Sequence, residues 1–132
     1  MPLKYTINKI ENNIQKKHTA KYYAFAKSDG IMDLDDISKR IQEISTVSSI
    51  DTIAVIEGLI KVVGDGLVDG KTMKLGKFGI FSISIRSEGV EELDKFSLKN
   101  IVQYKINFLP GSYLKRLISN LKPMLLKHNS NE

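Results

Sequence analysis

The 132-residue sequence contains no cysteine and no tryptophan, and only three prolines. Without cysteine, the chain can form neither a disulfide nor a thiolate metal site. No apolar run is long enough to cross a bilayer, and the first residues lack the basic and then apolar pattern of a secretory signal. We therefore expect a cytoplasmic protein with no membrane partner.

Residue combinations that support catalysis are also scarce. The two histidines, His18 and His128, lie in a polar loop and near the end of the sequence, without a partner at metal-ligand spacing. The glycines of Gly64-Asp65-Gly66 and Gly76-Lys77-Phe78-Gly79 do not match a phosphate-binding loop or a dinucleotide fingerprint. We expect no enzymatic activity, no cofactor, no bound metal and no small-molecule substrate.

Charge is distributed unevenly along the chain. The sequence carries a net charge of +5, and residues 71–132 hold 11 of the 20 Lys/Arg but only 5 of the 15 Asp/Glu. The second half therefore carries +6, whereas residues 1–70 carry −1. Such asymmetry favours a polyanionic partner, and charge that merely maintains solubility is the alternative.

The first half of the sequence predicts a hairpin followed by two helices. Residues 3–27 contain two runs of strand-like alternation around a polar loop, which is typical of a β-hairpin. Asp33 is a suitable N-cap for a helix whose apolar face begins at Leu34 and ends at Ile44. Ser48 and Asp51 resemble a capping box for a second helix over residues 49–66.

The second half predicts strands and a short final helix. Alternating apolar residues occur near residues 73–75, 81–85 and 102–108, and Pro110-Gly111 ends the last of these strands. Apolar residues at helical spacing from Leu114 to Leu121 predict a short helix that Pro123 closes.

The helix predicted over residues 49–66 is apolar around most of its circumference. Ile53, Ile56, Ile60, Val63 and Leu67 form one stripe, and Val55, Leu59 and Val62 form another. A helix of this kind must be covered on several sides. It is either the central helix of the chain's own core or part of a dimer interface, and we favour the dimer.

Two motifs resemble those of the HU/integration-host-factor family of bacterial histone-like proteins. Leu75-Gly76-Lys77-Phe78-Gly79-Ile80-Phe81 resembles the family's "L-x-G-F-G-x-F" signature, with Lys77 where the first signature glycine usually lies. Phe108-Leu109-Pro110-Gly111-Ser112-Tyr113-Leu114-Lys115 resembles "F-x-P-G-x-x-L-K". The stretch from Asp33 to Gly70 resembles the family's two-helix dimerisation unit, and the first 30 residues resemble those of an HU-related variant from Bacteroidetes.

The resemblance implies an α+β, HU-like fold. It has a two-helix N-terminal dimerisation unit, an antiparallel β-sheet and a C-terminal helix, here with an extra N-terminal β-hairpin. The expected domains are a hairpin extension over residues 1–32, a DNA-binding domain over 33–125 and a disordered tail over 126–132. The implied function is histone-like: a homodimer on the nucleoid that binds double-stranded DNA through phosphate contacts, with little sequence preference.

The expected site residues follow from the resemblance and from charge. The candidates for DNA binding are Lys71, Lys74, Lys77, Arg86, Lys99, Lys105, Lys115 and Arg116. The candidates for the dimer interface are Ile53, Ile56, Leu59, Ile60, Val63, Phe78 and Phe81.

The sequence departs from the family in its β-arm. Typical members end a basic arm in "R-N-P", whose proline inserts between base pairs and kinks the duplex. Here the stretch from Ser87 to Asn100 has four acidic residues, two lysines and no proline, so we expect weak DNA bending. The alternative function is an HU-like domain repurposed as a protein-interaction or structural module. Tyr22, Tyr23 and Phe25 of the hairpin then either dock a partner or form the core of the sheet, and we favour the core.

Overall fold

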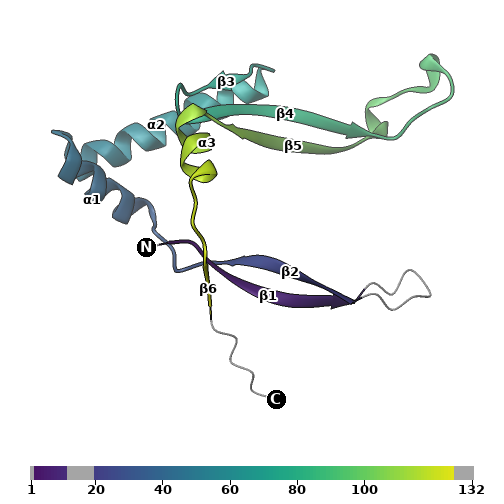
Figure 1. The fold of residues 1–132 in the computed structure, drawn as a ribbon. Coiled ribbons are helices and arrows are strands. Elements are labelled where there is room, and N and C mark those ends of the chain that lie inside the picture. Colours follow the sequence, from purple (N-terminus) through teal and green to yellow (C-terminus); the bar gives the residue numbers. More distant parts are fainter. Residues whose placement is uncertain (1, 12–19, 127–132) are drawn as a thin grey trace. The chain divides into compact units, whose positions relative to one another are not determined.

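The computed structural model describes residues 2–11 and 20–126 (Figure 1). The described residues form two compact units. The first unit combines the residues up to Asp33 with those from Ser119 onward, and the second comprises Leu34–Ile118. Each unit contains one three-stranded sheet.

The first unit is built around the predicted N-terminal hairpin, which the structure confirms. Strand β1 (Lys4–Glu11) pairs antiparallel with β2 (Ala20–Lys27) along its whole length. On the other edge of β1 lies the two-residue strand β6 (Met124–Leu125), which runs parallel to it. The sequence pattern does not predict β6, because a strand of two residues has no periodicity to detect.

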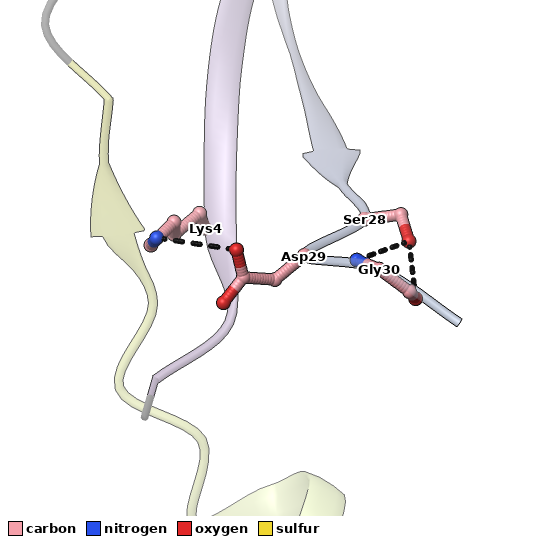
Figure 2. A network of polar contacts seen from close by, with 4 residues as sticks. All are labelled: Lys4, Ser28, Asp29 and Gly30. Carbon is pink, nitrogen blue, oxygen red and sulfur yellow. Dashed lines mark hydrogen bonds and ion pairs between the residues drawn. The ribbon is translucent and has the colours of Figure 1, made fainter. Parts of the chain in front are cut away.

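Polar contacts fix the chain where it leaves β2 (Figure 2). The Lys4 ammonium lies 3.4 Å from a carboxylate oxygen of Asp29. The Ser28 hydroxyl donates to the carbonyl oxygen of Gly30 at 3.1 Å and accepts from its N–H at 3.4 Å. These contacts close the turn that follows the hairpin.

The second unit begins with the two predicted helices, α1 (Leu34–Ile44) and α2 (Ser49–Val68). The Ser48 hydroxyl accepts from the Asp51 N–H at 3.1 Å, which confirms the predicted cap. Helix α2 runs two residues further than predicted and ends where Gly70 adopts a φ of 80°. The Lys71 N–H then donates to the Gly66 carbonyl at 2.9 Å, the closing bond of a Schellman motif.

An antiparallel sheet follows, in the order β3-β4-β5. It consists of β3 (Met73–Lys74), β4 (Gly79–Ser87) and β5 (Ile101–Pro110). The long strands β4 and β5 are joined by the arm, residues 88–100, which contains two short 3₁₀ turns, Leu93–Lys95 and Leu98–Asn100 (Figure 1). The Glu88 N–H donates to the Asn100 carbonyl at 2.8 Å and closes the base of the arm.

The last helix is shorter than the sequence predicts. Helix α3 covers Ser112–Ser119, so Leu121 lies beyond it. The residue before a proline is disfavoured in a helix, and Pro123 therefore pushes the chain toward the extended form that continues into β6. Leu117 and Leu121 have the spacing of a helix, but the helix ends before Leu121.

The two family-like motifs interlock in the second unit. The Gly111 N–H donates to the Phe78 carbonyl at 3.0 Å, and the Leu75 N–H donates to the Gly79 carbonyl at 2.9 Å. The rings of Phe78, Phe81 and Phe108 gather beside these bonds, with the Phe81 and Phe108 centroids 4.9 Å apart. The motifs are thus two halves of one packing arrangement.

Glycine is required in this arrangement for two physical reasons. Gly79 has a φ of 151°, and a Cβ there would overlap the Leu109 carbonyl and the Phe108 ring. At Gly111 a Cβ would overlap the backbone of Lys77. Lys77 stands in place of a signature glycine without strain, because every residue with positive φ in the described chain is a glycine, and Gly76 takes the left-handed position.

Replacing Gly111 with alanine should therefore destabilise the protein. We expect the free energy of unfolding to fall by about 2–4 kcal/mol, because the obstacle is backbone that cannot move aside. Gly89→Ala is the control, since a Cβ at Gly89 meets no atom within 4 Å. Urea unfolding of both variants checks this. Equal midpoints would contradict the proposed packing.

Candidate nucleic-acid interface

The strand register divides the side chains of the β3-β4-β5 sheet between two faces. Lys74 lies opposite Ile80, Ser84 opposite Lys105, and Arg86 opposite Gln103. Directly opposed residues share a face, and residues two apart on a strand share it too. Lys74, Arg86 and Lys105 therefore lie on one face, which we call the cationic face.

Most of the other residues of the cationic face are polar, and two, Ile80 and Leu109, are apolar. The face also carries Ile80, Ser82, Ser84, Gln103, Asn107 and Leu109. None of the three strands contains an aspartate or a glutamate. A surface with three cations, hydroxyls and amides but no carboxylate is suited to binding an anion.

The three cations have no internal counterion. Lys74, Arg86 and Lys105 are exposed. No carboxylate in the described part of the chain forms an ion pair with any of them; ion pairs occur at other cations, among them Lys4–Asp29, Arg40–Glu43, Lys61–Asp65 and Lys95–Glu92. Arg86 and Lys105 are diagonal neighbours, with Cα atoms roughly 7–8 Å apart in such a pair. Because both are exposed, solvent screens their repulsion in the free chain, and a bound anion would neutralise it.

The remaining candidate cations lie on other elements. Lys71 follows the end of α2, and Lys77 lies in the turn before β4. Lys99 belongs to the second 3₁₀ turn of the arm, whereas Lys115 and Arg116 lie on α3. The register thus groups three of the eight candidates on one face. It also adds Ser82, Ser84, Gln103 and Asn107, which the alternation along the two strands would have identified as their neighbours.

The opposite face of the same sheet is apolar. Phe81 pairs with Phe108, Ile83 with Ile106, and Ile85 with Tyr104. Ile106 remains 63% exposed, although a residue of this kind is normally buried in a sheet with one solvated face. The chain on its own leaves this face uncovered.

Helix α2 meets this apolar face around an open hollow of about 340 Å³. Five of the seven predicted dimer-interface residues line the hollow: Leu59, Ile60, Val63, Phe78 and Phe81. The other two, Ile53 and Ile56, are half-buried on α2 and lie outside the lining. The structure therefore gathers most of the predicted set around one apolar concavity.

Helix α2 is rich in apolar residues, yet most of their side chains are exposed in the single chain. Ile60 is 59% exposed, and Leu67 is the one apolar side chain among the described residues that is buried. The helix also contains Gly58 and Gly64, where a Cβ would meet no atom of the chain within 4 Å. Glycine within a helix costs about 1 kcal/mol relative to alanine, and nothing in the described chain requires it at these positions. Close approach of another molecule to this side of the helix would require glycine at these positions.

Residues 1–124 match the HU-HIG family, described as an HU domain fused to a winged helix-turn-helix, immunoglobulin or glycine-rich motif. The chain belongs to the HU-HIG family. The resemblance drawn from the two motifs is thereby confirmed. No curated protein matches the sequence.

Solved structures show the same fold. A crystal structure of a candidate bacterial DNA-binding protein from Bacteroides vulgatus superposes with a TM-score of 0.66 at 17% sequence identity. The match covers 94% of this HU-HIG chain and 48% of the other, so the chain spans about half the length of that relative. The predicted α+β class and HU-domain relationship are confirmed. In the described residues, no helix has the length and apolar character to cross a membrane.

Proposed function

We propose that this HU-HIG chain is a histone-like, nucleoid-associated protein that binds double-stranded DNA in the cytoplasm without sequence specificity. The observation that carries the proposal is the cationic face, where Arg86 and Lys105 are neighbours, Lys74 lies further along the same face, and the strands carry no carboxylate. The description of the Bacteroides vulgatus relative as a candidate DNA-binding protein supports it. The function is binding rather than catalysis.

The mechanism is neutralisation of phosphates. Each lysine or arginine that contacts the DNA backbone releases condensed counterions, so affinity falls steeply as salt rises. The hydroxyls of Ser82 and Ser84 and the amides of Gln103 and Asn107 donate to phosphate and sugar oxygens on the same face. A sheet surface that presents these groups follows the shape of the backbone and reads little of the base sequence.

The DNA-binding form is a homodimer. The hollow between α2 and the apolar sheet face presents Leu59, Ile60 and Val63 to a partner, and a second copy of the same chain offers a matching apolar surface. Because one sheet face is apolar and the other cationic, a partner on the apolar face leaves the cationic face open to DNA. Two subunits then double the number of phosphate contacts.

The remaining assignments complete the proposal. Residues 1–32 are a hairpin extension, 33–125 are the DNA-binding domain, and the tail 126–132 lies almost entirely outside the described residues. Lys71, Lys77, Lys99, Lys115 and Arg116 add cations from elements that flank the sheet or lie further along the chain. A fluorescence-anisotropy titration of unrelated duplexes tests the function, and absence of salt-sensitive binding to any of them would reject it.

DNA bending by this protein should be weak. The arm contains no proline, and Glu88, Glu91, Glu92 and Asp94 repel the phosphates that a wedge would have to approach. We expect energy transfer between dyes at the two ends of a short duplex to change little when the protein binds. A large bend that Leu93→Ser abolishes would contradict this expectation and identify Leu93, which is 93% exposed, as a wedge.

The second candidate function is a protein-interaction or structural module. The observation that favours it is the acidic arm, where Leu93 is exposed between Glu92 and Asp94 and Leu98 is exposed further along. A solvated pair of leucines on an acidic loop fits a protein partner better than it fits a phosphate backbone. If the anisotropy titrations detect no binding to any nucleic acid, this function replaces the first.

A further inference from the structure

The N-terminal sheet has one face on which lysines flank a pair of aromatic residues. The register of β1 and β2 pairs Lys4 with Lys27, Thr6 with Phe25, Asn8 with Tyr23, and Ile10 with Lys21. These eight residues share a face, which we call the Tyr23/Phe25 face. Tyr22 and Glu11 fall on the opposite face, where Tyr22 pairs with Lys9 and Glu11 with Ala20.

Both rings of the Tyr23/Phe25 face are accessible. Tyr23 is 47% exposed and Phe25 is 40% exposed. Their cross-strand partners, Asn8 and Thr6, are small, so neither ring is hidden beneath a large neighbour. Neither ring stacks on another aromatic side chain in the described residues, where ring contacts join Phe78, Phe81 and Phe108.

The spacing of the rings suits two successive bases. Tyr23 and Phe25 are two residues apart on one strand, which places their Cα atoms roughly 6–7 Å from each other on the same side. Aromatic side chains on a sheet stack two or three bases in this way in proteins that bind unpaired strands. Bases inside a duplex are already stacked on each other and are not available to the rings.

Charge on the Tyr23/Phe25 face favours a nucleic acid over an apolar protein segment. Lysines lie at both ends of the aromatic pair: Lys4 and Lys27 at one end and Lys21 at the other. Lys21 and Lys27 are exposed and form no ion pair within the described residues, whereas Lys4 lies near Asp29 (Figure 2). The strands contribute no carboxylate to this face, because Glu11 points to the other side.

We propose that the Tyr23/Phe25 face binds an unpaired DNA strand, with consecutive bases on Tyr23 and Phe25 and with Lys21 and Lys27 at the phosphates. This function goes beyond duplex binding and uses a different unit of the chain, so it does not depend on the cationic face. Stacking provides the affinity and lysine provides the salt dependence, which makes the site tolerant of base sequence.

The first test compares ring removal on the two faces of the sheet. The full chain is titrated with fluorescein-labelled (dT)20 at low salt. The variant Tyr23→Ala/Phe25→Ala should bind it at least about tenfold more weakly, and Tyr22→Ala should bind it as the wild type does. Tyr22 is the matched control because it adjoins Tyr23, points to the opposite face and is 70% exposed.

The outcomes separate this site from duplex binding. Both variants should bind duplex DNA normally, since the cationic face is unchanged. If duplex binding is absent while (dT)20 binding depends on the two rings, the duplex function fails and this proposal stands. Equal (dT)20 affinities for the ring-deleted variant and the Tyr22→Ala control would overturn the proposal, as would wild-type protein that binds duplex but no (dT)20.

A second test keeps the aromatic character of the face. The chain has no tryptophan, so Phe25→Trp places its one tryptophan on the Tyr23/Phe25 face, where it can be excited selectively over the tyrosines. We expect (dT)20 to quench its emission in step with the anisotropy change, because a base stacked on indole quenches it. Binding of (dT)20 with unchanged tryptophan emission would overturn the proposal even if the alanine variant misfolds.

Discussion

Replacing Ile60 with aspartate should convert this HU-HIG protein from a dimer into a folded monomer. Ile60 lines the hollow between α2 and the apolar sheet face and is 59% exposed in the single chain. A carboxylate there is therefore solvated in the monomer, which keeps its fold. In the dimer the same carboxylate is buried without a partner, at a cost of about 3–5 kcal/mol. The dissociation constant should rise by more than about a hundredfold.

The control for this variant is Ile50→Asp. Ile50 is on the same helix and 78% exposed, but it lies in the first turn of α2 and does not line the hollow. A carboxylate at that position suits the helix dipole. Sedimentation velocity at micromolar concentration should show dimers for the wild type and for Ile50→Asp, and monomers for Ile60→Asp. A wild-type protein that sediments as a stable monomer would remove the basis of the homodimer proposal.

Much of the second unit could be predicted from sequence because its signals are local. The Ser48 cap and the apolar spacing of α2 depend on neighbours within a few residues, and the structure places the helix at Ser49–Val68. The two motifs around Gly79 and Gly111 are also short runs of sequence, although the atoms that leave no room for a side chain at each glycine belong to the other motif. Signals of this kind can be recognised in a short stretch of sequence without knowledge of the rest of the chain.

The elements that the sequence does not predict depend on contacts between distant residues. Strand β6 exists because Met124 and Leu125 find β1, more than 100 residues earlier, and the end of α3 depends on that continuation. The grouping of Lys74, Arg86 and Lys105 depends on strand register, which alternation within one strand cannot fix. Sequence supplied the eight candidate cations, and only pairing of the strands selects the three that share a face.

The register also explains how one small sheet can serve two purposes. A slip of a single residue in β5 would move Lys105 and Gln103 to the apolar side and Tyr104 and Ile106 to the cationic side. The interlock of Gly79 with Pro110, and of Gly111 with Phe78, sets that register at one end of the strands. The packing motif and the binding surface are therefore linked through strand pairing, although no glycine touches a cation.

Removing the charges of Arg86 and Lys105 should produce the largest loss of duplex affinity. The two side chains are diagonal neighbours without a counterion, and the dimer carries each of them twice. For Arg86→Ala/Lys105→Ala we expect duplex binding to weaken by at least roughly tenfold at moderate salt, to a similar degree on unrelated sequences. The slope of log affinity against log salt should fall by about one for each phosphate that is no longer neutralised, hence by about four per dimer.

The matched control removes the same charge from a different surface of the same unit. Lys39→Ala/Arg40→Ala deletes two exposed cations of α1, so both double variants have the same net charge. If affinity follows net charge alone, the two variants weaken binding equally. If the cationic face binds the DNA backbone, the α1 variant keeps nearly the full slope of log affinity against log salt, because the deleted charges make no phosphate contact. Anisotropy titrations from 50 to 300 mM salt (about the range in which such slopes are linear) distinguish the two results. A loss of affinity confined to the α1 variant would show that DNA binds outside the sheet.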